Sequence, residues 1–166
     1  MIVALAAAAS ISASLAGYFS SEALANYSLS NTSQLAGVSE ADFATQIVLR
    51  DEALYFQAFS AFYRNETNLG NLYYGMMTEE SSQNLVVDEE SGAFHFKSEY
   101  LNKMYEDADS LEQLAVDKLK LAEAADRYAR AFIIMTSSIS AAIVVFGEIS
   151  RVRASAKSTS PPSPIS

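Results

Sequence analysis

The sequence predicts an all-α membrane protein in which two transmembrane helices flank an extracytoplasmic helical domain. Two apolar stretches carry this prediction, and the two transmembrane helices built on them are placed at residues 1–25 and 131–150. Residues 26–130 lie between them, hold most of the acidic side chains and show helical periodicity. A tail rich in serine and proline follows at 151–166. We therefore expect a span, an outer helical region, a second span and a short tail.

The second apolar stretch is the clearer span. Residues 131–149 read AFIIMTSSISAAIVVFGEI and carry no charge before Glu148. Basic residues bracket the stretch on both sides: Arg127, Arg130, Arg151 and Arg153. A helix rises about 1.5 Å per residue, so these residues reach roughly across the hydrocarbon core of a bilayer. The stretch is typical of a membrane-spanning helix.

The first apolar stretch, MIVALAAAASISASLAGYF at residues 1–19, owes its hydrophobicity mostly to alanine. A signal peptide is one alternative, because Ala23-Leu24-Ala25 resembles a cleavage site. No Lys or Arg precedes the apolar run, although the n-region of a signal peptide requires one. A buried helix of a soluble bundle is the other alternative. We favour a membrane helix.

Small residues recur at helical spacing on both spans. Ala9, Ala13 and Gly17 share one face of the first span, and Ser137 and Ala141 share one face of the second. Small side chains let helix backbones approach closely in lipid. We predict that these residues dock the spans on each other or on a partner subunit.

The region after the first span predicts two helices. The first helix continues from Tyr18 through a polar stretch, and Gly37 is a plausible stop because glycine often ends helices. Ser39 then predicts the N-cap of a new helix, with acidic residues in its first turn. This helix is expected to end near Arg64.

The second half of that helix is apolar on most sides. Its aromatic side chains are Tyr55, Phe56, Phe59, Phe62 and Tyr63. A helix of this kind needs cover on several faces. The cover is either the protein's own small domain or another subunit, in which case these residues form a docking surface.

We expect a turn, a short helix and a loop within residues 65–97. NETNLG at 65–70 reads as a turn, and a short helix is expected through Tyr73, Tyr74 and Met77. Residues 78–93 are acidic and polar, which indicates an exposed loop.

A long helix is expected from Ser98, with Glu99 in its first turn. One apolar stripe recurs along it at intervals of three or four residues: Leu101, Met104, Ala108, Leu111, Ala115, Leu119 and Ala122. No Gly or Pro interrupts residues 98–146, so the helix should run directly into the second span.

Basic residues near the spans predict the orientation. Arg151, Arg153 and Lys157 follow the second span, so the positive-inside rule places both termini in the cytoplasm and residues 26–130 outside. Arg127 and Arg130 oppose this orientation. Their spacing from Glu123 and Asp126 predicts ion pairs that weaken the conflict: Glu123–Arg127 and Asp126–Arg130. The chain is expected to be an integral, multi-pass membrane protein.

A search for catalytic and ligand-binding groups finds little. The chain has no cysteine and one histidine, His95, which excludes zinc-thiolate sites and di-iron sites built on paired Glu-x-x-His motifs. No glycine-rich phosphate loop is present, and Asp88-Glu89-Glu90 lacks the spacing of an EF-hand. The net charge of −9 argues against nucleic-acid binding. We expect no enzymatic activity, no cofactor and no metal site.

Two pieces of the chain carry a resemblance at the level of pattern. They are SASLAGYFSSEALANYSLSNTSQ and ADRYARAFIIMTSSISAAIVVFGEISRVR, near the two ends. Together they resemble a family of uncharacterised prokaryotic membrane proteins, in which a span, an extracytoplasmic helical insert and a second span follow one another. This sequence departs from that family by lacking a further span after Arg153. The resemblance implies a topology and no activity.

These observations favour a non-catalytic accessory or structural subunit of a larger integral membrane protein complex. The expected partners are other membrane protein subunits and the lipid bilayer. One alternative is a self-assembling surface or filament protein, since an apolar helix precedes a polar domain as in pilins. The other alternative is a membrane sensor that binds a ligand among its outer helices.

Overall fold

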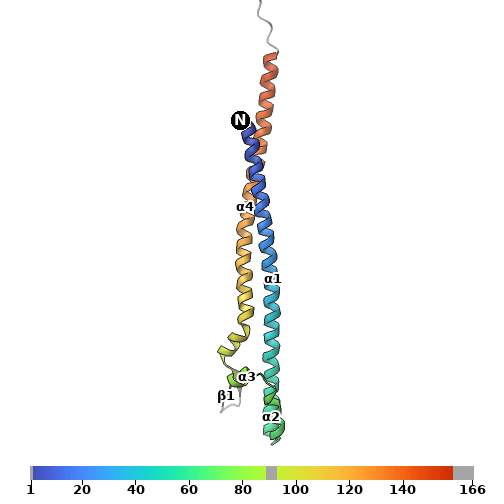
Figure 1. Cartoon of the computed structure of the whole chain (residues 1–166), viewed down its shortest axis with the longest axis vertical. Helices are drawn as coiled ribbons and strands as arrows, with labels where there is room; N and C mark the ends of the chain where they lie inside the picture. Colours follow the sequence, from blue (N-terminus) through green and yellow to red (C-terminus); the bar gives the residue numbers. More distant parts are fainter. Residues whose placement is uncertain (1, 89–92, 159–166) are drawn as a thin grey trace, which may run out of the picture. The chain divides into compact units, whose positions relative to one another are not determined.

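The computed structural model describes residues 2–88 and 93–158, and nearly all of them are helical (Figure 1). The elements in chain order are α1 (Ile2–Tyr63), α2 (Thr67–Gly75), α3 (Glu79–Asn84), β1 (Leu85–Val87), β2 (Phe94–Phe96) and α4 (Ser98–Ser158). The all-α prediction is confirmed, and α1 and α4 each contain a stretch long and apolar enough to cross a membrane.

The chain divides into two compact units. Unit 1 comprises Met1–Ser28 and Lys118–Ser166, and unit 2 comprises Leu29–Asp117. Both α1 and α4 contribute residues to each unit. In each unit the two helices pack antiparallel, since residues later in α1 contact residues earlier in α4.

Both helices carry a small residue at every seventh position of their buried face. On α1 these positions are Ala16, Ala23, Ser30, Gly37, Ala44, Asp51 and Ala58, of which only Asp51 is charged. On α4 they are Ala108, Ala115, Ala122 and Ala129. A seven-residue repeat keeps one face turned toward a partner helix, as in coiled coils. Small side chains at this face allow a close helix–helix approach.

Unit 1 shows how the two helices contact each other. The Ser12 hydroxyl donates to the Met135 sulfur at 3.4 Å. The Phe19 ring stacks on the Phe132 ring, with centroids 5.8 Å apart, and lies 5.3 Å from the Tyr128 ring. A hydroxyl–sulfur contact and a group of aromatic rings therefore join α1 and α4 in unit 1.

The helix pair of unit 2 is joined by polar contacts within its small-residue face. The Ser30 hydroxyl donates to the Ala115 carbonyl oxygen at 2.8 Å, so a buried polar side chain is satisfied by the facing backbone. The Thr45 and Tyr105 hydroxyls are 2.9 Å apart and share a hydrogen bond.

The predicted helix stop at Gly37 and the predicted N-cap at Ser39 are wrong. Helix α1 continues without a break from Ile2 to Tyr63. Gly37 is buried against α4, where an added Cβ would lie 3.3 Å from the Ala108 carbonyl oxygen. The glycine thus serves the close approach of two helices and does not end one.

The prediction for the segment after α1 is correct in part. The chain turns after Tyr63, with Asn65 in the left-handed region at φ 62°, and α2 already begins at Thr67. The predicted turn over residues 65–70 is therefore too long. Helix α2 includes Tyr73 and Tyr74, and Met77 lies beyond its end.

The predicted exposed loop over residues 78–93 is also wrong in part. Thr78 caps α3 by accepting a hydrogen bond from the Ser81 N–H at 3.2 Å, and strand β1 follows directly. Strands β1 and β2 pair antiparallel, with Val86 opposite His95. Glu89 and Glu90 of the acidic run lie outside the described residues.

Helix α4 begins at Ser98 and continues through the second apolar stretch, which confirms both predictions. The predicted tail begins at residue 151, and α4 includes its residues up to Ser158. The rest of the predicted tail, 159–166, lies outside the described residues.

Unit 2 has a compact core where α1, the β-hairpin and the start of α4 meet. Its buried side chains are Tyr55, Met77, Phe96 and Tyr100. The Phe96 and Tyr100 rings are 5.1 Å apart between centroids. The strands are short, and this core holds them against the helices.

Candidate interaction surfaces

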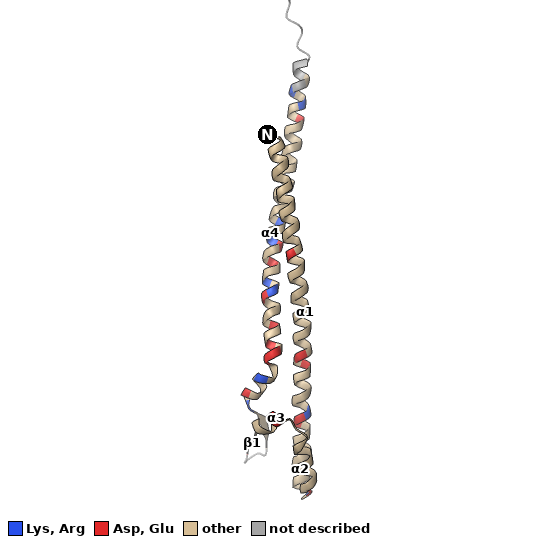
Figure 2. Ribbon diagram, viewed as in Figure 1, with Lys and Arg blue, Asp and Glu red and all other residues tan. Residues whose placement is uncertain are grey.

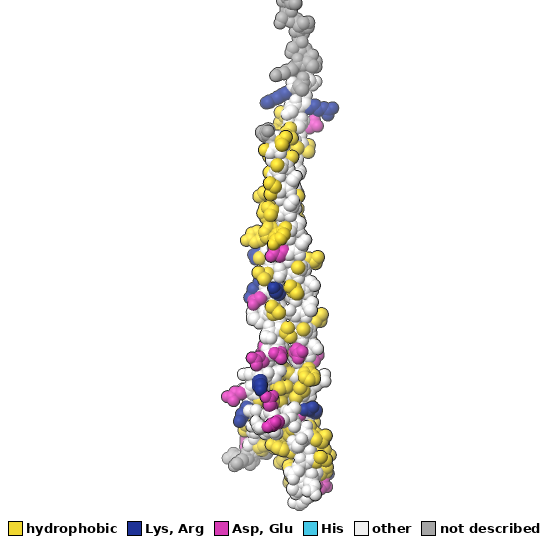
Figure 3. Space-filling model, viewed as in Figure 1, with side chains coloured by type: hydrophobic (Ala, Val, Ile, Leu, Met, Phe, Trp, Pro, Cys, Tyr) yellow, Lys and Arg dark blue, Asp and Glu magenta, His cyan; other side chains and the backbone are white. Residues whose placement is uncertain are grey.

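The apolar stretches of α1 and α4 are hardly covered by the chain itself. Only 11% of the apolar window in α1 and 0% of that in α4 is buried. Figure 3 shows hydrophobic side chains over the face of unit 1 that is in view. Exposed apolar surface of this extent is typical of contact with lipid or with another protein.

The predicted small-residue face of the first span is not the face through which α1 packs on α4. The buried residues there are Ser12 and Ala16, whereas Ala13 and Gly17 are exposed and Ala9 is half-buried. A Cβ added to Gly17 would have no neighbour within 4 Å. The face is therefore open at Gly17 within unit 1.

The structure brings two of the predicted docking residues together. Ala13 and Ser137 line one hollow of about 230 Å³, which Ala16, Ile133 and Thr136 also border. Ala141 is exposed one turn further along α4. The small residues of the two spans therefore border a shared surface at Ala13 and Ser137.

The five predicted aromatic residues of α1 divide into two groups. Tyr55 is buried, and its ring lies 4.4 Å from that of Phe94 on β2. The remaining four are between 40% and 83% exposed: Phe56, Phe59, Phe62 and Tyr63. The internal packing role therefore applies to Tyr55, and the other four remain docking candidates.

Helix α2 and its C-cap residue add exposed apolar side chains that sequence reasoning missed. Leu72 and Met76 are both more than half exposed. Gly70 of the same helix is buried against Phe62, and a Cβ there would lie 2.5 Å from the Phe62 ring. We call the four exposed aromatic residues of α1 with Leu72 and Met76 the aromatic patch. The run LYYGMM at 72–77 was the available sequence signal.

A charged hollow in unit 1 lies beside the second span. Arg130 pairs with Asp126 at 2.7 Å, which confirms one of the two predicted ion pairs. The Nε of Arg127 donates to the backbone carbonyl oxygen of Glu123 at 3.3 Å. These four residues and Tyr27 line a hollow of about 280 Å³.

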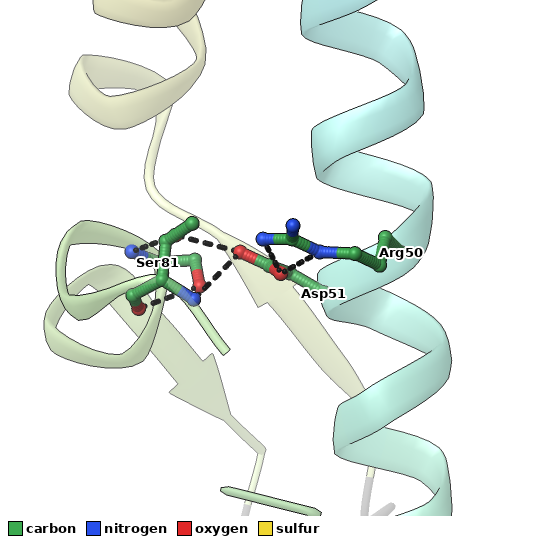
Figure 4. Close-up of polar contacts among 4 residues, drawn as sticks. Arg50, Asp51 and Ser81 are labelled. Atoms are coloured by element: carbon green, nitrogen blue, oxygen red, sulfur yellow. Dashed lines mark hydrogen bonds and ion pairs between the residues drawn. The ribbon is translucent and has the colours of Figure 1, made fainter. Parts of the chain in front are cut away.

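Unit 2 contains a buried polar cluster around Asp51 (Figure 4). One Asp51 oxygen accepts from the Arg50 guanidinium at 2.9 Å, and the other accepts from the Thr78 hydroxyl at 2.6 Å and the Thr78 N–H at 3.1 Å. Burial opposes the charge, but hydrogen bonds from Ser81, Thr78 and Arg50 hold the pKa of Asp51 below its usual value. Asp51 therefore fixes the N-terminus of α3 to α1 as a carboxylate.

Tyr100 lies in the core close to this cluster. Its hydroxyl is buried and has no hydrogen-bond partner among the described residues. Burial raises the pKa of Tyr100, so the phenol stays neutral and acts as an apolar ring in the core.

Among residues 2–88 and 93–158, no group of three His, Cys, Asp or Glu side chains is placed to hold a metal ion. His95 is exposed on β2. Comparisons with protein-family models, with curated proteins and with solved structures found no match to this chain.

Proposed function

We propose that the chain is a non-catalytic accessory subunit of a larger integral membrane protein complex. The observation that carries the proposal is the uncovered apolar window of α4, of which no part is buried by the chain itself. In this proposal both termini are cytoplasmic, residues 26–130 lie outside, and lipid and neighbouring subunits cover the two spans.

Two surfaces are available for neighbouring subunits. Within the bilayer, the exposed Ala13 and Gly17 offer a face where another helix backbone could approach closely, and a Cβ at Gly17 would meet no atom of the described chain within 4 Å. Outside the bilayer, the aromatic patch of unit 2 offers exposed Phe and Tyr side chains, which are enriched at protein interfaces. The proposal assigns both surfaces to subunit contacts.

A bulky residue at Gly17 should weaken partner binding and leave the stability of the fold unchanged. A photo-crosslinking amino acid at Phe59, in native membranes, should give a discrete adduct with another membrane protein. Gly17→Leu should reduce the adduct yield by about tenfold, because the added side chain blocks close helix approach, equivalent to roughly 1.4 kcal/mol. The variant should retain the melting temperature of the parent chain, because a Cβ at Gly17 meets nothing within 4 Å.

The matched control is Ala4→Leu, an exposed alanine on the opposite side of the same helix. It should leave the adduct yield unchanged. Equal yields for all three chains would contradict docking through the Gly17 face. A lone monomer without any crosslinked neighbour would contradict the subunit proposal as a whole.

A further inference from the structure

Four aromatic rings of unit 1 lie at one level of its helix pair. They belong to Tyr18 and Phe19 on α1 and to Tyr128 and Phe132 on α4, with neighbouring centroids 5.3 to 5.8 Å apart. The two tyrosines are exposed. Tyrosine is enriched where membrane proteins cross from hydrocarbon to headgroups. Both helices are uncharged on the apolar side of this level, α1 before Tyr18 and α4 from Ala131 to Gly147.

The uncharged part of α4 in unit 1 lies between basic residues, as Figure 2 shows. The charged hollow extends from Arg130, which lies between Tyr128 and Phe132 at the aromatic level, to residues on the polar side of that level. Glu123 precedes Tyr128 by five residues, about 7.5 Å along a helix. A headgroup layer is about 5–7 Å deep on each side of the hydrocarbon core. The hollow therefore overlaps the depth of lipid headgroups.

Two of the four charged side chains that line the hollow form an ion pair. Asp126 and Arg130 form an ion pair with each other at 2.7 Å. Arg127 uses its Nε for the Glu123 carbonyl, and its terminal NH2 groups donate to no acceptor within the described chain. The Glu123 carboxylate belongs to an exposed residue one turn before Arg127. One cation and one anion thus remain available side by side.

We propose that this hollow binds the headgroup of a phospholipid carrying a primary amine, of the phosphatidylethanolamine type. The Arg127 guanidinium and the Tyr27 hydroxyl donate to the phosphate, and the Glu123 carboxylate accepts from the ammonium group. A choline headgroup has no N–H to donate, and an anionic headgroup without an amine places its negative charge near Glu123. This inference rests on the proposed membrane insertion.

Native mass spectrometry of the full-length chain in mild detergent tests the inference. The chain is mixed with equal amounts of phosphatidylethanolamine, phosphatidylcholine and phosphatidylglycerol of identical acyl chains. The ethanolamine lipid should be retained about fivefold more than either competitor, because it alone satisfies both charges. Arg127→Gln should abolish this preference, and Glu123→Gln should shift it toward phosphatidylglycerol.

The matched control is Arg153→Gln, which removes the same charge beyond the other end of the uncharged run of α4. It should preserve the preference. Equal retention of the three lipids, or an unchanged preference in Arg127→Gln, would overturn the inference while leaving membrane insertion intact. Release of the chain from membranes by alkaline carbonate would instead overturn the proposed function itself.

Discussion

Asp51→Asn is expected to lower the free energy of unfolding by about 3 kcal/mol. Asp51 is fully buried and accepts hydrogen bonds from Arg50 and from both the N–H and the hydroxyl of Thr78. An asparagine at this position has one acceptor oxygen in place of two, and its NH2 group faces groups that are themselves donors. The Thr78 hydroxyl also caps α3, so the loss extends to the Ser81 N–H.

The effect can be measured as the unfolding midpoint in mild detergent. Asp107→Asn is the matched control, because it makes the same substitution at an exposed position. The control should be within about 0.5 kcal/mol of the parent chain. Equal stability of the two variants would show that the Asp51 cluster contributes nothing.

The same cluster gives a dependence on pH. The folded chain holds the pKa of Asp51 below its usual value, so the unfolded chain binds the proton more readily and this contribution to stability rises with pH. It is complete above the unfolded pKa of about 4 and is lost as the pH falls through the lower folded value. The midpoint difference between the parent chain and Asp51→Asn should therefore shrink below about pH 4.

Ala122→Leu is expected to destabilise the helix pair of unit 1 by about 3 kcal/mol. Ala122 is completely buried at a position of the seven-residue repeat on α4. Its neighbours in the repeat are alanines, so the helices are close and a larger side chain must push them apart. The thermal midpoint should fall by roughly 6–12 °C for a chain of this size.

Ala131→Leu provides the comparison for this substitution. Ala131 is on the same helix but is exposed, so the leucine has room. Its midpoint should match that of the parent chain. A midpoint for Ala122→Leu as high as that of Ala131→Leu would mean that the small-residue repeat does not set the helix spacing.

The long elements were predictable because their signals are local. Ser98 begins α4 as expected, with Glu99 in the first turn and no glycine or proline until Gly147. The Gly37 prediction failed because a glycine has the same local signal at a helix end and at a helix crossing. Only the seven-residue spacing of buried residues along α1 distinguishes a helix end from a helix contact at Gly37. The closeness of Gly37 to Ala108 on α4 confirms the contact.

The interaction surfaces were predictable only in part. The aromatic residues of α1 were identified, but burial of Tyr55 depends on Phe94, which is distant in sequence. The small residues of the first span were identified, yet the face that packs on α4 is displaced by one residue, to Ser12 and Ala16. The role of Asp51 was missed because its partner Thr78 lies 27 residues further along the chain.

We propose that lipid covers the apolar stretches of α1 and α4, and the reactivity of single cysteines distinguishes lipid cover from exposure to water. The chain has no native cysteine, so single cysteines can be placed at Val144, which is 65% exposed, and at Leu121, which is 54% exposed. In intact membranes a water-soluble maleimide should label Leu121→Cys quickly and leave Val144→Cys unlabelled until the membrane is dissolved in denaturing detergent. Equal labelling of the two positions in intact membranes would contradict the account.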